Sequence, residues 1–292
     1  MTWSRLLPGA ALLLAVLGAL NKSGGALLHG HWSYPVLLAA AAVLGAVLIA
    51  WGLRGAKPQP GRARTLGRWS AALAGVGVAA LCTWLAPYPA LGQPAIATQQ
   101  SGSGIWMGPQ EAPVGIAFIP GALVDPRAYE NIFAPLAEAG YPVYIGKPPL
   151  GLAFGVPDVV GQARQAVPGV QQWVVAGHSL GGAVASGQTA GAAGLILLAG
   201  FPINDISGQS APVLSISATN DLLATPEDIA DSRATLPPDT EFVAIDGGIH
   251  AYFGDYGPQA GDGEPTISRE QQQQQTQSAI AEFLAQVAPP GP

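Results

Sequence analysis

The stretch from Val174 to Ala185, VVAGHSLGGAVA, is an apolar run interrupted by a single serine between glycines. Gly177, Ser179 and Gly181 form a G-x-S-x-G pattern, which requires a strand, a sharp turn and a helix in that order. A serine at the tip of so tight a turn has a strained backbone, and a side chain two residues away on either side would collide with the strand or the helix. The stretch therefore predicts a strand that ends just before Ser179 and a helix that begins just after it.

Charge divides the chain into two unlike parts. Seven of the twelve Lys and Arg residues precede residue 90, whereas the first of the eighteen acidic residues is Glu111. The part from Glu111 onward combines five basic with eighteen acidic side chains. It has no basic stripe, which excludes the usual basis for nucleic-acid binding.

The basic part contains three apolar runs, Leu6 to Leu20, Tyr34 to Leu53 and Trp69 to Tyr88. The second and third are about twenty residues long, the length that crosses a hydrocarbon core. The first is shorter, and it either spans with snorkelling ends or is an uncleaved signal-like segment. Tryptophans near the ends of the runs are typical of an aromatic belt. These features predict two to three transmembrane helices and a lipid bilayer as partner.

The loops predict the orientation of these helices. Five basic residues lie between Arg54 and Arg68, whereas the stretch from Asn21 to His31 holds one Lys. Because positive residues favour the cytoplasmic side, we expect the chain after Tyr88 to lie outside the cytoplasm, in a multi-pass protein of the cell membrane.

The sequence predicts three regions along the chain: a membrane region over residues 1–88, a flexible Pro- and Gly-rich linker over 89–113, and a folded domain over 114–292. Strands that are apolar throughout alternate with helices in the domain, which indicates a doubly wound, mostly parallel α/β sheet. The expected strands cover residues 115–119, 141–145, 172–176, 194–199, 213–218 and 241–245.

The end of the chain predicts one more helix. Ser268 stands three residues before Gln271, as in a capping box, and apolar residues follow at helical spacing. The glutamine run 271–275 fits either a disordered tract or the exposed side of this helix, and the helical propensity of glutamine favours the second.

A nucleophilic serine needs a base, because its hydroxyl is a weak nucleophile at neutral pH. Two of the four histidines lie in the membrane part, and the side chain of His178 is expected to point away from Ser179. His250 remains, in the glycine-rich stretch after the last strand. Asp221 at the end of strand 213–218 is the expected third member, in the order Ser, Asp, His; Asp246 is its rival.

An oxyanion hole needs two converging N–H groups. Leu180, after the serine, supplies one, and the turn Pro120 to Leu123 supplies the other, from Ala122 or from Leu123. The connection from Gly200 to Ala211 is too short for a helical cap, so the site is expected to be open. Four residues could line a modest acyl pocket: Leu150, Leu152, Phe154 and Phe201.

With these motifs the domain resembles an α/β-hydrolase, in particular the small dienelactone-hydrolase-like serine hydrolases. The resemblance rests on GHSLGG at 177–182, TND at 219–221 and GGIH at 247–250, and it covers the domain but not the membrane region. It implies an α/β-hydrolase fold and an ester-hydrolysing triad of Ser179, Asp221 and His250, and the short connection from Gly200 to Ala211 predicts that the cap is minimal. One departure is Pro120-Gly121, where His-Gly is usual ahead of the oxyanion turn.

The expected activity is hydrolysis of carboxylic esters through an acyl-enzyme, with a small-molecule or lipid ester as substrate, no cofactor and no metal. A thioesterase or lipid hydrolase would use the same triad. A hydrolase-fold binding module without activity is the alternative of a different class.

Overall fold

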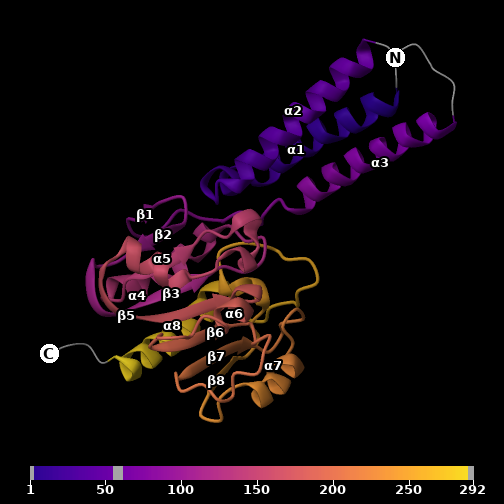
Figure 1. Cartoon of the computed structure of the whole chain (residues 1–292). Coiled ribbons are helices and arrows are strands. Elements are labelled where there is room, and N and C mark those ends of the chain that lie inside the picture. The colour runs from indigo at the N-terminus through magenta and orange to yellow at the C-terminus, as the bar shows by residue number, and fades with distance from the viewer. Residues whose placement is uncertain (1–2, 55–61, 289–292) are drawn as a thin grey trace. The chain divides into compact units, whose positions relative to one another are not determined.

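A computed structural model describes residues 3–54 and 62–288 (Figure 1). The chain divides into two compact units, Met1–Pro87 and Tyr88–Pro292, called here the helical unit and the sheet unit. The sequence places this boundary after residue 88.

In its described residues, 3–54 and 62–87, the helical unit contains three helices, α1 (Trp3–His29), α2 (Ser33–Leu53) and α3 (Arg62–Trp84). Within the described residues, two of them, α1 and α2, are long and apolar enough to cross a membrane. The expectation of about three spanning helices is therefore one too high by this measure. The reason is α3, whose apolar portion is only Trp69–Trp84. The first helix is conversely longer than its apolar run predicts.

Small residues bring α1 and α2 together. A Cβ atom at Gly9 would lie 2.8 Å from the carbonyl oxygen of Gly45, and one at Gly45 would lie 3.0 Å from the carbonyl oxygen of Gly9. This backbone approach is typical of helices packed in a membrane.

The sheet unit is built on eight strands in the order β1-β2-β4-β3-β5-β6-β7-β8. Strands β3 to β8 run parallel, and β1 and β2 add an antiparallel edge beside β4. The strands are β1 (Gln99–Gln100), β2 (Gly104–Met107), β3 (Glu111–Ile119), β4 (Val143–Gly146), β5 (Gly169–His178), β6 (Gly194–Leu198), β7 (Val213–Ala218) and β8 (Glu241–Ile245).

The six predicted parallel strands are all present, and the doubly wound α/β class is confirmed. The stretch expected to be a linker, 89–113, differs from the prediction, because it contains β1, β2 and the start of β3. The four-residue strand β2 joins the sheet through long-range pairing with β4, and a composition rich in Pro and Gly does not reveal such pairing.

Helices and short 3₁₀ turns connect the strands and cover both faces of the sheet (Figure 1). They are η1 (Pro126–Tyr129), α4 (Glu130–Glu138), η2 (Pro149–Gly151), η3 (Ala153–Gly155), α5 (Val159–Ala166), α6 (Leu180–Ala185), α7 (Pro226–Ser232), η4 (Arg233–Thr235), η5 (His250–Phe253) and α8 (Arg269–Val287). No helix lies between β6 and β7, which agrees with the predicted minimal cap.

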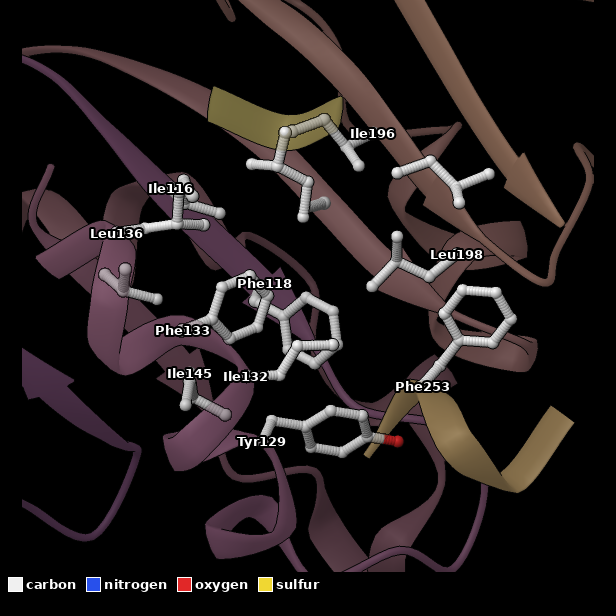
Figure 2. Packing of buried hydrophobic residues seen from close by; sticks show 14 of the residues in the cluster. Ile116, Phe118, Tyr129, Ile132, Phe133, Leu136, Ile145, Ile196, Leu198 and Phe253 are labelled. Atoms are coloured by element: carbon white, nitrogen blue, oxygen red, sulfur yellow. The ribbon is translucent and has the colours of Figure 1, made fainter. Parts of the chain in front are cut away.

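Two hydrophobic cores form because neighbouring residues of each strand point to opposite faces. Ile116 and Phe118 of β3 pack with α4 and α8 on one face, as Figure 2 shows in part. Ala117 and Ile119 pack with α5 on the other face. Both faces are buried, so the parallel strands are apolar throughout, and the carboxyl ends of β3 to β8 meet at one edge, called here the carboxyl edge.

At the carboxyl edge, α6 approaches β3 and β5 so closely that only glycine fits. A Cβ atom at Gly177 would lie 2.3 Å from the backbone of Gly181, and one at Gly181 would lie 2.1 Å from the carbonyl oxygen of Ile119. Both distances are far below a van der Waals contact, which confirms the predicted need for glycine two residues on either side of Ser179.

We therefore expect Gly181→Ala to lower the free energy of unfolding by more than about 2 kcal/mol, because backbone must move to admit the methyl group. Gly187→Ala is the matched control, since a Cβ atom there meets only the carbonyl of Val184, at 3.5 Å. Thermal unfolding of the two purified variants measures the difference. Equal melting temperatures would contradict the proposed tight contact.

Candidate active site

Ser179 stands at the turn between β5 and α6, one residue beyond the carboxyl end of the strand. Its backbone has φ 54° and ψ −124°, a conformation that residues with side chains rarely adopt. Hydrogen bonds hold the turn on both sides: the Ser179 N–H donates to the carbonyl of Leu198 at 2.9 Å, and the Ala183 N–H donates to the carbonyl of Ser179 at 3.1 Å. The side chain is half-buried.

Asp221 and His250 are in direct contact. Nδ1 of His250 lies 2.7 Å from Oδ2 of Asp221, and both side chains are almost completely buried. The other carboxylate oxygen of Asp221 accepts hydrogen bonds from the N–H groups of Leu223 and Ala224, at 2.7 and 2.8 Å. These bonds hold the carboxylate in one orientation.

This contact selects one tautomer of His250. A carboxylate can only accept, so Nδ1 carries the proton and Nε2 is left with a lone pair. In the part of the chain that the structure describes, Nε2 is buried and has no hydrogen-bond partner. The Ser179 hydroxyl is not hydrogen-bonded to it; such catalytic bonds are often long until substrate binds. The site therefore has an unused proton acceptor at the carboxyl edge.

Asp246, the rival carboxylate in the sequence, is arranged differently. It is exposed, and its Oδ1 accepts a hydrogen bond from Oγ1 of Thr219 at 3.1 Å. The geometry thus favours Asp221 as the partner of His250.

The segment that carries His250 is held by two residues that the sequence does not single out. The carboxylate of Asp262 accepts from the N–H groups of His250 and Ala251, at 3.1 and 2.8 Å. The side chain of Gln272 accepts from the Ile249 N–H at 2.9 Å and donates to the Ile249 carbonyl at 2.8 Å.

Gln272 and Gln273 are buried in α8, so the interpretation of the glutamine run as an exposed face is wrong at these two positions. The capping box of α8, Ser268 with Gln271, is present as predicted. A run of identical residues carries no periodicity, and for that reason the sequence alone does not show which glutamines face the core.

The turn after β3 narrows the choice of oxyanion donors. The Leu123 N–H donates to the carbonyl of Gly151 at 2.8 Å, so it is not free to bind an oxyanion, and the prediction that includes Leu123 is wrong. Leu123 also has a positive φ, 56°. Leu180 begins α6, where a first-turn N–H has no partner within the helix. Ala122 and Leu180 remain the expected donors.

His178 does not point away from the site, contrary to expectation. Its ring centroid lies 4.5 Å from that of His250, and its Nδ1 lies 2.9 Å from the hydroxyl of Tyr129. The same hydroxyl accepts the Gly121 N–H at 3.0 Å. Tyr129 thus links the turn after β3 to the turn after β5, and no sequence motif indicated this.

Burial keeps both members of this link neutral. Burial is the main cause that holds the pKa of His178 well below its ordinary value, and the proximity of His250 lowers this pKa further. The backbone of His250 has a smaller, opposing effect on it. Burial likewise raises the pKa of Tyr129. The Tyr129 hydroxyl therefore donates to a neutral imidazole.

The four residues expected to line an acyl pocket follow β4 and β6 at the carboxyl edge. Leu150 and Leu152 are half-buried, whereas the side chains of Phe154 and Phe201 are 66% and 37% exposed. Their role in substrate binding stays a prediction.

Comparison with known proteins identifies the fold. A family model described as the alpha/beta hydrolase family matches residues 115–274. Among solved structures, a thermophilic esterase from Thermogutta terrifontis with bound propionate is 17% identical, with a TM-score of 0.50 and coverage of 65% of this chain and 90% of that chain. Est1E from Butyrivibrio proteoclasticus is 15% identical, with a TM-score of 0.44 and coverage of 66% and 100%. No curated protein matches the chain significantly in sequence.

The lowered pKa of His178 predicts a loss of stability in acid. In the unfolded chain this histidine binds a proton near pH 6.5, whereas in the folded chain it does so only at lower pH. Below pH 6.5 the unfolded state therefore binds more protons, and the free energy of unfolding falls as pH falls, by at most about 1.4 kcal/mol per pH unit.

We expect His178→Gln, which does not titrate, to show a smaller loss of stability than the wild type between pH 7.5 and 5.5. Urea unfolding followed by tryptophan fluorescence measures both. Parallel losses in the two proteins would show that His178 is not the group responsible.

Proposed function

The chain belongs to the alpha/beta hydrolase family, and from this we propose that it is a serine hydrolase that cleaves carboxylic esters through an acyl-enzyme. The observation that carries the proposal is the buried contact between Asp221 and His250 at the edge of the sheet where Ser179 stands. The similar fold of the propionate-bound Thermogutta terrifontis esterase is consistent with ester chemistry on this fold.

The roles follow from the atoms. Nε2 of His250 takes the proton of the Ser179 hydroxyl as Oγ attacks the ester carbonyl, and Asp221 stabilises the imidazolium that forms. The N–H groups of Leu180 and Ala122 stabilise the negative charge on the carbonyl oxygen. When the tetrahedral intermediate collapses, His250 returns the proton to the leaving alcohol, and a water molecule then releases the acid by the same steps in reverse order.

We further propose that α1 and α2 anchor the protein in the cell membrane and that α3 also crosses it, which places the sheet unit outside the cytoplasm. The length and hydropathy of the two helices support the anchor, and the five basic residues between Arg54 and Arg68 support the side. Sidedness depends on α3: its apolar portion, Trp69–Trp84, measures about 24 Å as a helix, so a crossing requires local thinning of the bilayer.

Ser179→Ala should abolish labelling by a fluorophosphonate probe and turnover of p-nitrophenyl butyrate, since both need the Ser179 oxygen. Ser210→Ala, at an exposed serine on the opposite edge of the sheet, should change neither. Intact cells labelled with a membrane-impermeant probe test sidedness in the same experiment: labelling of unbroken cells supports the outer side, and labelling only after lysis contradicts it. A folded wild type without any labelling would instead favour a binding module.

A pair of variants tests which carboxylate, Asp221 or Asp246, is the partner of His250 in the triad. Asp221→Asn should lower kcat by about 10⁴-fold, because an amide in place of the carboxylate no longer holds the His250 tautomer that can accept the Ser179 proton. Asp246→Asn should leave kcat within a few fold, because Asp246 bonds only the Thr219 hydroxyl among the described residues. If Asp246→Asn lowered kcat far more than Asp221→Asn, Asp246 would be the carboxylate of the triad.

A further inference from the structure

We propose that the carboxyl edge of the sheet unit is a docking surface for a lipid bilayer, through which Ser179 meets ester substrates held in the membrane. The docking rests on the proposed membrane anchor, and the delivery of substrate rests on the proposed ester hydrolysis.

The first observation is where large apolar side chains are exposed. In the described residues of the sheet unit there are six that are more than a third exposed: Leu91, Phe154, Phe201, Ile203, Leu222 and Leu223. Single exposed apolar residues are ordinary on a protein surface, but a group on one face marks an interaction site.

Five of the six belong to one face, because they follow the carboxyl ends of three parallel strands. Phe154 comes after β4, Phe201 and Ile203 come after β6, and Leu222 and Leu223 come after β7. The turns at the opposite edge expose no large apolar side chain among the described residues. There the chain exposes polar residues such as Gln110 and Asp239.

Two of these apolar residues, Phe201 and Leu223, adjoin the candidate active site. A Cβ atom at Gly200, next to Phe201, would lie 2.8 Å from the carbonyl oxygen of Ser179. The Leu223 N–H donates to the carboxylate of Asp221 at 2.7 Å. The apolar face and the reacting groups therefore share one edge, and a surface that meets this face also meets Ser179.

The second observation identifies a bilayer as the occupant. Tyr88, the first residue of the sheet unit, is fixed at this edge, because its N–H donates to the Leu123 carbonyl at 2.6 Å and its carbonyl accepts the Asp125 N–H at 3.0 Å. Trp84, the last residue of α3, precedes Tyr88 by only four positions. Four residues of fully extended chain span at most about 14 Å. The chain thus enters the sheet unit at its apolar edge from a segment with two helices of membrane-spanning length.

The apolar side chains and the negative charge of the sheet unit indicate which lipid headgroups it would meet. Apolar side chains that enter the headgroup and acyl boundary gain the free energy of leaving water. The part of the chain from Glu111 onward carries eighteen acidic against five basic residues, and the exposed Asp205 lies two residues after Ile203. A surface of zwitterionic lipid fits this charge, whereas an anionic surface would repel it.

The test uses the full chain with a single cysteine for an environment-sensitive dye. Cys82, the one natural cysteine, is replaced in Cys82→Ala, and the dye NBD is attached to Ile203→Cys or, as the matched control on the opposite edge, to Asp239→Cys. Both proteins are reconstituted in phosphatidylcholine vesicles.

We expect the emission of NBD at position 203 to shift to the blue and to be quenched by spin-labelled lipid, with water-like emission and no such quenching at position 239. Water-like emission at both positions would overturn the proposal. A blue shift at 203 without quenching by the lipid would also overturn it, because a protein surface would then cover the face.

Activity separates docking from hydrolysis. Ile203→Asn with Leu222→Asn should lower turnover of a long-chain ester embedded in the vesicles at least tenfold and leave turnover of soluble p-nitrophenyl acetate within twofold. An equal loss on both substrates would contradict delivery from the membrane. A wild type that docks by the NBD measurement but hydrolyses neither ester would refute the proposed function and leave the docking surface intact.

Discussion

The contact of backbone with backbone around Ser179 is the constraint on which the sheet unit depends. Because Gly177 and Gly181 carry no side chains, β5 and α6 meet directly at the turn, and α6 also lies against the end of β3. Backbone packing of this kind is stiff. It fixes the turn that carries Ser179 relative to the turn that carries Ala122, so the proposed oxyanion donors are in place before any substrate arrives.

His250 has the opposite problem, since it follows the last strand in a glycine-rich segment with little stiffness of its own. Distant residues supply what the segment lacks. Asp221 fixes the imidazole from the end of β7, Asp262 holds the backbone N–H, and Gln272 holds the preceding residue from α8. The final helix therefore supports the proposed base as well as covering the sheet, and the orientation of the His250 ring depends on the fold of the whole unit.

The features that the sequence predicted correctly are those that depend on short local patterns. The G-x-S-x-G turn, the apolar parallel strands and the capping box at Ser268 each need only a few neighbouring residues to be recognised. The features that it missed depend on partners far along the chain. Pairing with β4 makes a strand of residues 104–107, and a bond to Gly151 occupies the N–H of Leu123. Neither partner has a motif, so only the folded chain identifies them.

The neutral state of His178 has a consequence for the proposed chemistry. When His250 takes the serine proton it becomes a cation, and the centroid of the His178 ring lies 4.5 Å away. A second cation at that distance would cost about 4 kcal/mol at an effective dielectric constant of about 20, enough to slow the step by about 10³-fold. Burial lowers the pKa of His178 and so prevents this repulsion, while the Tyr129 hydroxyl satisfies its Nδ1. A histidine beside the serine is thus compatible with a histidine base only because the fold buries it and keeps it uncharged.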